Sequence, residues 1–374
     1  MRVTDVGDSF GSLELSYAVR DSGVQVMGRI ITVAGEIAAE TLGRTLVHEH
    51  MHIATAGWEA DTLHPMPSDS DVVKKGTEMC RELRSRGYDS FIDPLPGNMG
   101  RRLDLVAEMS ARSGMNIICA TGLFAERYGA TIYWKGKFDY LRAIGQEDSY
   151  VRYLADVFVN EIENGVGSDK IRCGIIKVAS TTAITEYEMA TLKAAALAAV
   201  ETDTPVTTHS DDGLLGEEQQ RVLLSLGVSA RKIIIGHSCN TTEHRYHRCV
   251  VDNGSFIAFD RFGYTVAQSD DNRIHSMLSL IDSGGLDHVL VSNDGVCNLR
   301  DTMQPPAWRE FYAQQERDGW NSLHFHDKIL PELRRRGLSE DILDTILVTN
   351  PRRVFTGEPA RRVQATAPAE EVVN

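Results

Sequence analysis

The sequence predicts an α/β fold, namely a single (β/α)8 TIM barrel with a short N-terminal β-hairpin and a flexible C-terminal tail. Eight short, apolar, β-rich runs alternate with helix-like segments, a pattern typical of parallel strands joined by right-handed crossovers. The chain has 374 residues, which is enough for one barrel of about 250 residues or more. Histidine, lysine and aspartate follow several of these runs, where a barrel carries its active site.

The eight expected strands end near Gly, Pro, Asn or Asp, which are common in turns. They cover Thr45–His50, Ser90–Asp93, Asn116–Ala120, Cys173–Val178, Pro205–His209, Lys232–His237, Ser255–Asp260 and His288–Ser292. The expected helices cover Asp71–Arg86, Arg101–Ser113, Ser149–Asn164, Thr185–Thr202, Gly216–Leu226, Thr242–Asn253, Arg273–Ser283 and Asp327–Arg335. An open doubly wound sheet is the alternative, but the chain lacks the G-x-G-x-x-G and G-x-x-x-x-G-K-[ST] motifs of its nucleotide-binding forms.

One barrel domain is expected rather than two domains, because no low-complexity linker divides the chain. Residues 1–34 form an N-terminal β extension with two weakly alternating stretches, LELSYAV and GRIITVAG. Residues 35–356 form the barrel. Residues 357–374, rich in Ala, Pro and Glu, form the tail.

The composition argues against nucleic acid and anionic membranes as partners. The net charge is −14, whereas binding to a phosphate backbone needs a basic surface. No run approaches the about 20 apolar residues of a membrane-spanning helix, and the N-terminus, MRVTDVGDSF, does not resemble a signal peptide. Six scattered cysteines without a C-x-x-C pair indicate reduced thiols. We therefore expect a cytoplasmic protein.

Metal-ligand residue types gather at the ends of the expected strands. They are His48 and His50 in the first strand, Lys177 in the fourth, His209 in the fifth, His237 in the sixth, and Asp294 just after the eighth. His48 and His50 are two residues apart, so both imidazoles point to one face of a strand, which inside a barrel is the axis. Imidazole and carboxylate bind zinc-like ions. The pattern therefore predicts a metal centre.

Two of these positions have alternative readings, and one H-x-H pair has a competitor. Asp294 would serve equally as the N-cap of a following turn. Lys177 taken alone is a salt-bridged lysine, since an ammonium group has no acceptor for a cation. If it is buried beside metals, its pKa falls, and the neutral amine can add carbon dioxide to form a carbamate that bridges two ions. His52 makes a second H-x-H pair with His50, and spacing alone does not choose between the pairs.

Other histidines and two cysteines have weaker claims to a role. His324 and His326 lack a preceding apolar strand and are expected on the surface, and His244 and His247 are expected to be solvated on a polar helix start. Cys239 and Cys297 follow His237 and Asp294 closely, so we expect them near the mouth of the barrel, as substrate-facing or oxidation-prone thiols.

Seven segments together resemble the phosphotriesterase family of the amidohydrolase superfamily, from about Gly28 to Phe355. In chain order they are LGRTLVHEHMHI, IIKVAS, VTTH, IIIGHSCN, SFIAFDRFG, VLVSNDG and VTNPRRVF. The resemblance implies a TIM barrel with a binuclear metal centre. By match, His48, His50 and Asp294 hold the more buried ion, His209 and His237 hold the more exposed ion, and a carbamylated Lys177 bridges them together with a hydroxide. Zinc is the expected metal, with manganese and cobalt as alternatives.

Two paired ions would lower the pKa of a shared water, so that hydroxide forms near neutral pH. Asp294 would then accept the proton of the attacking hydroxide, and Asp294 and Lys177 are the expected catalytic residues. The DRFG segment resembles the DRYG segment of the phosphotriesterase-like lactonases, which implies that Arg261 lies beside the substrate. Phe124 stands where those lactonases carry a tyrosine, and it leaves an apolar wall compatible with esters, triesters or amides. Alternatively, Phe124 packs at a strand end and Arg261 pairs with Asp260 or another carboxylate.

The expected function is a binuclear metal-dependent hydrolase that uses a metal-bridging hydroxide to attack a neutral lactone or carboxylic ester, with side activity on phosphotriesters. The acidic chain disfavours anionic substrates. The alternatives are a dedicated phosphotriesterase, an amide or carbamate hydrolase, and a non-catalytic barrel that binds a ligand or partner. A homodimer is also expected. The segment from Gly295 to about Phe325, with Trp308 and Trp320, is expected to set specificity.

Overall fold

The computed structural model describes residues 28–359, except residues 56, 61, 63–65, 129, 212, 301–309, 311, 312, 315, 316 and 318. The LELSYAV stretch, Trp308 and most of the expected tail lie outside the described residues.

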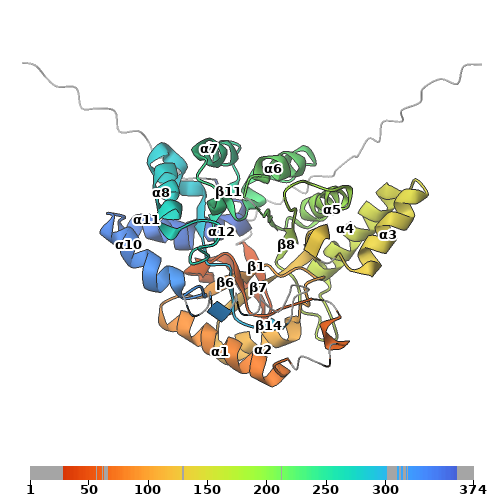
Figure 1. Cartoon of the computed structure of the whole chain (residues 1–374), viewed down its shortest axis with the longest axis horizontal. Coiled ribbons are helices and arrows are strands. Elements are labelled where there is room, and N and C mark those ends of the chain that lie inside the picture. The colour runs from red at the N-terminus through yellow and green to blue at the C-terminus, as the bar shows by residue number, and fades with distance from the viewer. Residues whose placement is uncertain are drawn as a thin grey trace, which may run out of the picture.

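Eight parallel strands form the centre of the molecule (Figure 1). Their hydrogen-bonded order follows the chain, β3 (Thr45–Leu46), β6 (Ser90–Asp93), β7 (Asn116–Leu123), β8 (Ile175–Val178), β9 (Val206–Thr207), β10 (Ile233–Ile235), β11 (Phe256–Phe259) and β12 (Val289–Val291). The first and last strands meet where the Val47 N–H donates to the Val291 carbonyl, 3.3 Å away. The predicted (β/α)8 barrel is therefore confirmed.

Two short parallel pairs extend this meeting line towards the carboxyl ends of the strands. β4 (Glu49–His50) pairs with β13 (Gly295–Val296), and β5 (Ile53–Ala54) pairs with β14 (Leu299–Arg300). The first expected strand, Thr45–His50, is thus divided between β3 and β4. The break brings the segment after β12 against the segment that carries His48 and His50.

Helices surround the strands on the outside (Figure 1). They are α1 (Asp69–Ser85), α2 (Leu103–Ser113), α3 (Ile132–Ala143), α4 (Glu147–Glu163), α5 (Glu186–Thr202), α6 (Gly216–Ser225), α7 (His244–Asp252), α8 (Asp270–Leu280), α10 (Leu330–Arg335), α11 (Glu340–Asp344) and α12 (Asn350–Thr356). Among the helices that the structure describes, none is both long and apolar enough to cross a membrane.

The sequence did not predict α3, α11 or α12. In α3 the only buried side chain is that of Phe138, while Ile132 is 91% exposed and Tyr140 67% exposed. A helix without a continuous apolar stripe leaves no periodic signal, which is why α3 was missed.

The core has two layers, and this arrangement positions the site. An inner cluster fills the barrel, and it includes Val47, Ile92, Ile118, Ile175, Ile234, Phe256 and Leu290. A larger outer cluster lies between strands and helices and includes Ile176 and Val178 of β8. Because side chains alternate along a strand, Lys177 lies on the inner face with Ile175.

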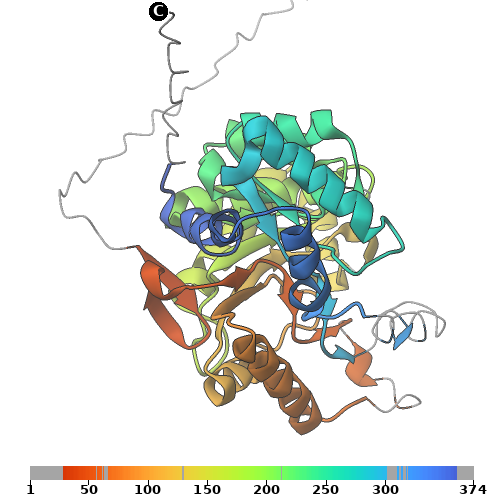
Figure 2. The same ribbon diagram turned by 90° about the vertical axis from the view of Figure 1, so that its left-hand side faces the viewer.

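An antiparallel hairpin, β1 (Arg29–Thr32) and β2 (Gly35–Ala38), covers the amino-terminal end of the barrel. Ile30 joins the inner cluster, and the Val33 N–H donates to the carbonyl of Ile117 at the start of β7, 2.9 Å away. Figure 2 shows the hairpin (red) beside α12 (blue). The hairpin runs to Ala38, beyond the expected boundary at residue 34.

Candidate metal centre

A pocket of about 620 Å³ lies at the carboxyl end of the barrel. The six residues predicted as metal ligands all line it, namely His48, His50, Lys177, His209, His237 and Asp294. They come from the link between β3 and β4, from β4 and β8, and from the segments that follow β9, β10 and β12. Phe124 and Arg261 line the same pocket. Strand ends separated by more than 200 residues in the sequence thus contribute to one cavity.

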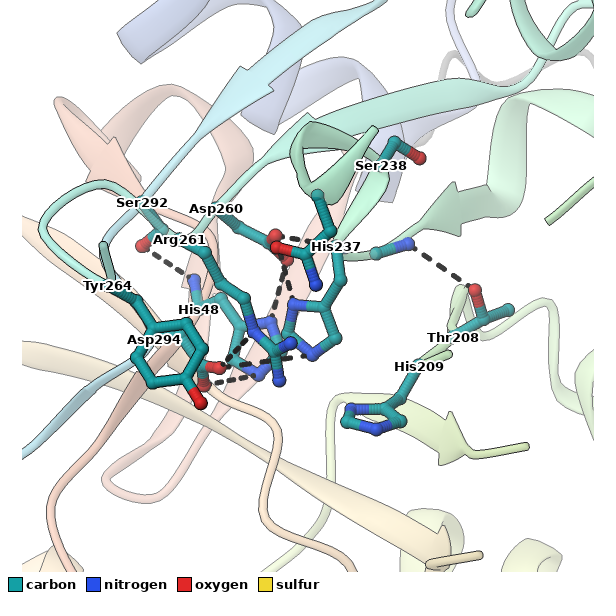
Figure 3. Close-up of polar contacts among 12 residues, drawn as sticks. His48, Thr208, His209, His237, Ser238, Asp260, Arg261, Tyr264, Ser292 and Asp294 are labelled. Atoms are coloured by element: carbon teal, nitrogen blue, oxygen red, sulfur yellow. Dashed lines mark hydrogen bonds and ion pairs between the residues drawn. The ribbon is translucent and has the colours of Figure 1, made fainter. Parts of the chain in front are cut away.

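Three imidazoles converge on the Asp294 carboxylate, and Figure 3 shows two of them, those of His48 and His237. The Nε2 atoms of His48 and His50 lie 3.3 and 3.2 Å from Oδ1 of Asp294, and Nε2 of His237 lies 3.9 Å from Oδ2. Among the described residues, His48, His237 and Asp294 each offer one ligand atom, and these atoms lie within 4.8 Å of one another. This arrangement can hold a divalent ion.

Buried carboxylates orient these three rings from behind. His48 donates its Nδ1–H to Asp260 at 2.8 Å, His237 donates to the other oxygen of Asp260 at 3.1 Å, and His50 donates to Asp93 at 3.1 Å. A donated Nδ1–H leaves Nε2 as a lone-pair donor directed into the pocket. Carboxylates that fix the tautomer of an imidazole in this way usually accompany metal-binding histidines.

A carboxylate also orients His209, but through the Nε2 atom of the ring rather than through Nδ1. Its Nε2 lies 3.1 Å from Oδ1 of Asp211, and Asp211 accepts a second hydrogen bond of 2.7 Å from the hydroxyl of Tyr128. Nδ1 is then left for a cation. The ring centroid of His209 lies 4.6 Å from that of His237, so the two rings form one wall of the pocket.

Two of the predicted ligands adopt a left-handed backbone conformation, with φ of 56° at His237 and 54° at Asp294. This region is disfavoured for residues other than glycine. A hydrogen bond from the backbone N–H holds each position, since the His237 N–H donates to the Asp260 carboxylate and the Asp294 N–H donates to the His48 carbonyl.

The electrostatics of the site suit a cation. Burial lowers the pKa of His48 and of His209 to about 4 and also lowers the pKa of His237, so these rings are neutral, as metal ligation requires. Burial opposes protonation of His50 as well, but the Asp294 and Asp93 carboxylates raise its pKa to about 9. Burial acts to raise the pKa of Asp294, yet His48 and Arg261 keep it well below the usual range.

Lys177 has the properties that carbamate formation requires. Its side chain is 1% exposed, its Nζ donates to the Thr208 carbonyl at 3.2 Å, and burial lowers its pKa to about 8. β7 lies close beside it, since a Cβ on Gly122 would be 1.8 Å from the Lys177 carbonyl oxygen. A much larger fraction of this amine is neutral near pH 8 than for an exposed lysine.

Phe124 and Arg261 contact the predicted ligands directly. The ring of Phe124 lies 4.8 Å from that of His209 and 5.9 Å from that of Tyr128. The Nε–H of Arg261 donates to Oδ2 of Asp294 at 2.8 Å. The ion pair that the sequence left open is therefore made with Asp294 rather than with Asp260.

Sequence reasoning missed the orienting roles of Asp93, Asp211 and Asp260 and the hydroxyl of Tyr128. Each carboxylate carried a signal, because Asp93 and Asp260 end apolar strands and Asp211 follows His209 by two residues. Tyr128 carried none, since it lies in a short 3-10 turn, Glu126–Tyr128.

Several weaker sequence readings were wrong. His247 is fully buried with Nε2 2.9 Å from the Ser238 carbonyl, and His324 is largely buried between Asp270 and the Gly319 carbonyl, so neither is a surface histidine. Cys239 and Cys297 are buried and are not among the described residues that line the pocket.

His52 is also buried, and within the described part of the chain neither of its ring nitrogens has a hydrogen-bond partner.

The chain matches the sequence model of the phosphotriesterase family over residues 28–355. A phosphotriesterase homology protein of Mycobacterium tuberculosis is 30% identical over 331 residues, which are 88% of this chain and 98% of that protein. An aryldialkylphosphatase of Saccharolobus solfataricus is 28% identical over 86% of this chain and 97% of its own length. The solved structure of a mutant PTE-like lactonase from Deinococcus radiodurans is 34% identical, covers 87% of this chain and 99% of its own, and gives a TM-score of 0.78.

Proposed function

The chain belongs to the phosphotriesterase family of metal-dependent hydrolases, and on this basis we propose that it hydrolyses neutral lactones or carboxylic esters at a binuclear metal centre. Phosphotriesters are proposed as a side reaction. The observation that carries the proposal is the convergence of His48, His50 and His237 on Asp294, with every Nδ1 already bound to a carboxylate.

The donor set fits two divalent ions. His48, His50 and Asp294 would hold one ion, His209 and His237 the other, and Lys177 as a carbamate would connect them. Neutral imidazoles and carboxylates suit zinc, manganese and cobalt alike, and zinc is proposed. When bound, a pair of ions supplies a water of lowered pKa and polarises a carbonyl or phosphoryl oxygen.

The residues of the chain have separate tasks in such a reaction. Asp294 has its pKa well below the usual range, so it is ionised and can accept a proton released at the centre of the pocket. Arg261 stabilises that ionised form through its 2.8 Å hydrogen bond. Asp93, Asp211 and Asp260 keep the imidazoles oriented, so that the ligands need no rearrangement during turnover.

The pocket walls favour a neutral substrate with apolar substituents. Apolar side chains form much of the wall, including those of Leu95, Met99, Val296 and Leu299. The guanidinium of Arg261 is already paired with Asp294, which leaves it little charge to offer an anion. A lactone or ester of moderate size fits a volume of about 620 Å³.

Phe124 favours one alternative, a dedicated phosphotriesterase. It has no hydroxyl group to hydrogen-bond a lactone, and its ring adds an apolar surface beside His209. Such a surface would accept the alkoxy or aryl groups of a triester.

One experiment separates these functions. The purified chain, loaded in turn with zinc, manganese and cobalt, is assayed on γ- and δ-lactones, acyl-homoserine lactones, aryl esters, an acetylated amine and a paraoxon-type triester. The proposal expects the highest kcat/KM on a lactone or ester and about two ions per chain by elemental analysis. A higher kcat/KM on the triester or the amide would replace it, and a folded chain that binds no metal would refute it. Intact mass under native conditions reports the added carbon dioxide on Lys177.

A further inference from the structure

Glu49 lies between two predicted ligands, yet its own side chain points away from them. Because neighbouring residues of a strand face opposite sides, the side chains of His48 and His50 face the pocket while that of Glu49 faces the segment after β12. Its exposed fraction is 0%. The structure describes no lysine or arginine within ion-pair distance of it. A buried carboxylate without a cation is costly unless hydrogen bonds satisfy it.

Glu49 finds those hydrogen bonds in the segment that carries Asp294. Its Oε1 accepts from the Ser292 hydroxyl at 2.8 Å, the Asn293 N–H at 2.9 Å and the Asn293 side-chain amide at 2.8 Å. Its Oε2 accepts from the Gly295 N–H at 3.2 Å. All four of these donors belong to residues 292–295, and the Ser322 side chain also interacts with the carboxylate.

The hydrogen bonds to Glu49 lie on both sides of Asp294, a residue with a strained backbone conformation. The N–H groups of Asn293 and Gly295, on either side of Asp294, both donate to Glu49, and the Asp294 N–H itself donates to the His48 carbonyl at 3.0 Å. Asp294 lies between them with φ of 54°. Three consecutive backbone N–H groups are thus fixed by the His48-Glu49 pair, which leaves the segment little freedom to return to an unstrained conformation.

We propose that Glu49 is a positioning residue, whose carboxylate holds Asp294 in its left-handed conformation so that the Asp294 side chain meets His48 and His50. The proposal rests on the proposed function, because the position of Asp294 matters as a metal ligand and proton acceptor. His237 offers a parallel, since it too has a left-handed backbone and donates its N–H to a buried carboxylate, that of Asp260, at 2.9 Å.

The same contacts connect Asp294 to the pocket wall. The Asn293 carbonyl accepts from the indole N–H of Trp320 at 2.8 Å, and the Asn293 side-chain oxygen accepts from the Phe325 N–H at 2.7 Å. Trp320 lines the pocket. Glu49 therefore supports both the ligand and the wall beside it, and its removal should displace both.

The test compares Glu49→Gln and Glu49→Ala in the full chain with a matched control, Glu188→Gln. Glu188 is also buried and also accepts two backbone N–H groups, from Thr185 at 3.1 Å and Glu126 at 3.0 Å, but the structure describes no contact between it and residues 292–295. Zinc affinity is measured by competition with a chromogenic chelator, and kcat and KM are measured on the best substrate of the panel. Crystal structures of the variants show where Asp294 lies.

For Glu49→Ala, one of the two zinc ions should bind about 10- to 100-fold more weakly, as when other orienting partners of a metal ligand are removed. kcat should fall with KM little changed, because the apolar walls remain. Glu49→Gln keeps one acceptor oxygen but turns its NH2 group towards the Gly295 N–H. Its losses of zinc affinity and kcat should therefore be smaller than those of Glu49→Ala. Glu188→Gln should bind zinc as the wild type does.

Two results would overturn the proposal. One is a Glu49→Ala chain whose Asp294 is unmoved and whose zinc affinity equals that of the wild type. The other is an equal loss of affinity in Glu188→Gln, which would show a general effect of losing a buried carboxylate. If Glu49→Ala does not fold, Glu49→Gln decides in its place. A wild-type chain without metal or hydrolysis would refute the proposed function alone, and the position of Asp294 in the variants would still decide the role of Glu49.

Discussion

Replacing Asp260 with asparagine should weaken both halves of the metal centre at once. Asp260 accepts from His48 at 2.8 Å, from the His237 ring at 3.1 Å and from the His237 N–H at 2.9 Å. An asparagine has one acceptor oxygen and an NH2 group. Its NH2 group must therefore face at least one of these three N–H groups, and that hydrogen bond is lost. His48 and His237 belong to different proposed ion sites. Loss of one orienting partner costs about 10- to 100-fold in affinity or activity.

Because two ligands lose their partner, we expect kcat/KM of Asp260→Asn to fall about 100-fold, which corresponds to about 2.7 kcal/mol of transition-state stabilisation. Asp93 provides the matched comparison. It orients one imidazole, that of His50, and accepts two backbone N–H groups, from Met51 at 3.0 Å and from Leu95 at 3.3 Å. The loss for Asp93→Asn should be about tenfold, or about 1.4 kcal/mol.

The assay measures kcat/KM and zinc affinity for both variants, and urea unfolding confirms that each remains folded at the assay temperature. The difference between the two variants is the decisive quantity. An Asp93→Asn loss equal to or greater than that of Asp260→Asn, or wild-type zinc affinity in both, would show that these carboxylates do not orient the ligands as argued.

Three further changes test other parts of the molecule. His209→Ala should bind about one ion instead of two and lose at least 10²-fold in kcat, measured by elemental analysis and turnover with zinc restored; full activity with one ion would contradict the assignment. Phe124→Tyr should raise the lactone-to-triester ratio of kcat/KM severalfold through its added hydroxyl. An unchanged ratio would show that the side chain at position 124 does not determine the preference between these substrates. Burial acts to raise the pKa of Asp270, but His324, the Gly263 N–H and Arg273 together lower it. The ionised Asp270 carboxylate therefore stabilises the folded chain above about pH 4, and this stabilisation is lost as pH falls through the lowered pKa of the folded state. In urea unfolding Asp270→Asn should therefore be less stable than wild type at pH 7, with the gap closing below about pH 4, and a gap independent of pH would exclude this linkage.

The sequence predicted the barrel because its strands are local and strongly patterned. Runs such as CGIIKV and KIIIGH are short, β-branched and bounded by turn residues, and each forms a strand at nearly the expected place. The alternation along β8 also predicts that Lys177 faces the axis with Ile175. α3 escaped prediction because Phe138 is its only buried side chain, while Trp134 and Leu141 are only partly buried against the core.

The convergence of the predicted ligands in one pocket could be predicted because their positions depend on the strand ends alone, whereas their supporting partners depend on distances across the barrel. His48 and Asp260 are 212 positions apart, and His50 and Asp93 are 43 apart. Local periodicity does not record which carboxylate lies behind which ring. The burial of His247 and His324 was missed for the same reason, since each depends on a carbonyl or carboxylate that another segment supplies.

The pairing of β4 with β13 has a consequence for biosynthesis. Glu49 and Gly295 are 246 positions apart, so a ribosome releases His48 and His50 long before Asp294 exists. If these residues hold an ion as proposed, the growing chain would offer that ion two ligands without the third. Under the proposed assignment, tight retention would begin only when the last strand has joined the first, and it would then stabilise the finished chain over every shorter one. Metal retention would in this way mark the molecules whose synthesis and folding are complete.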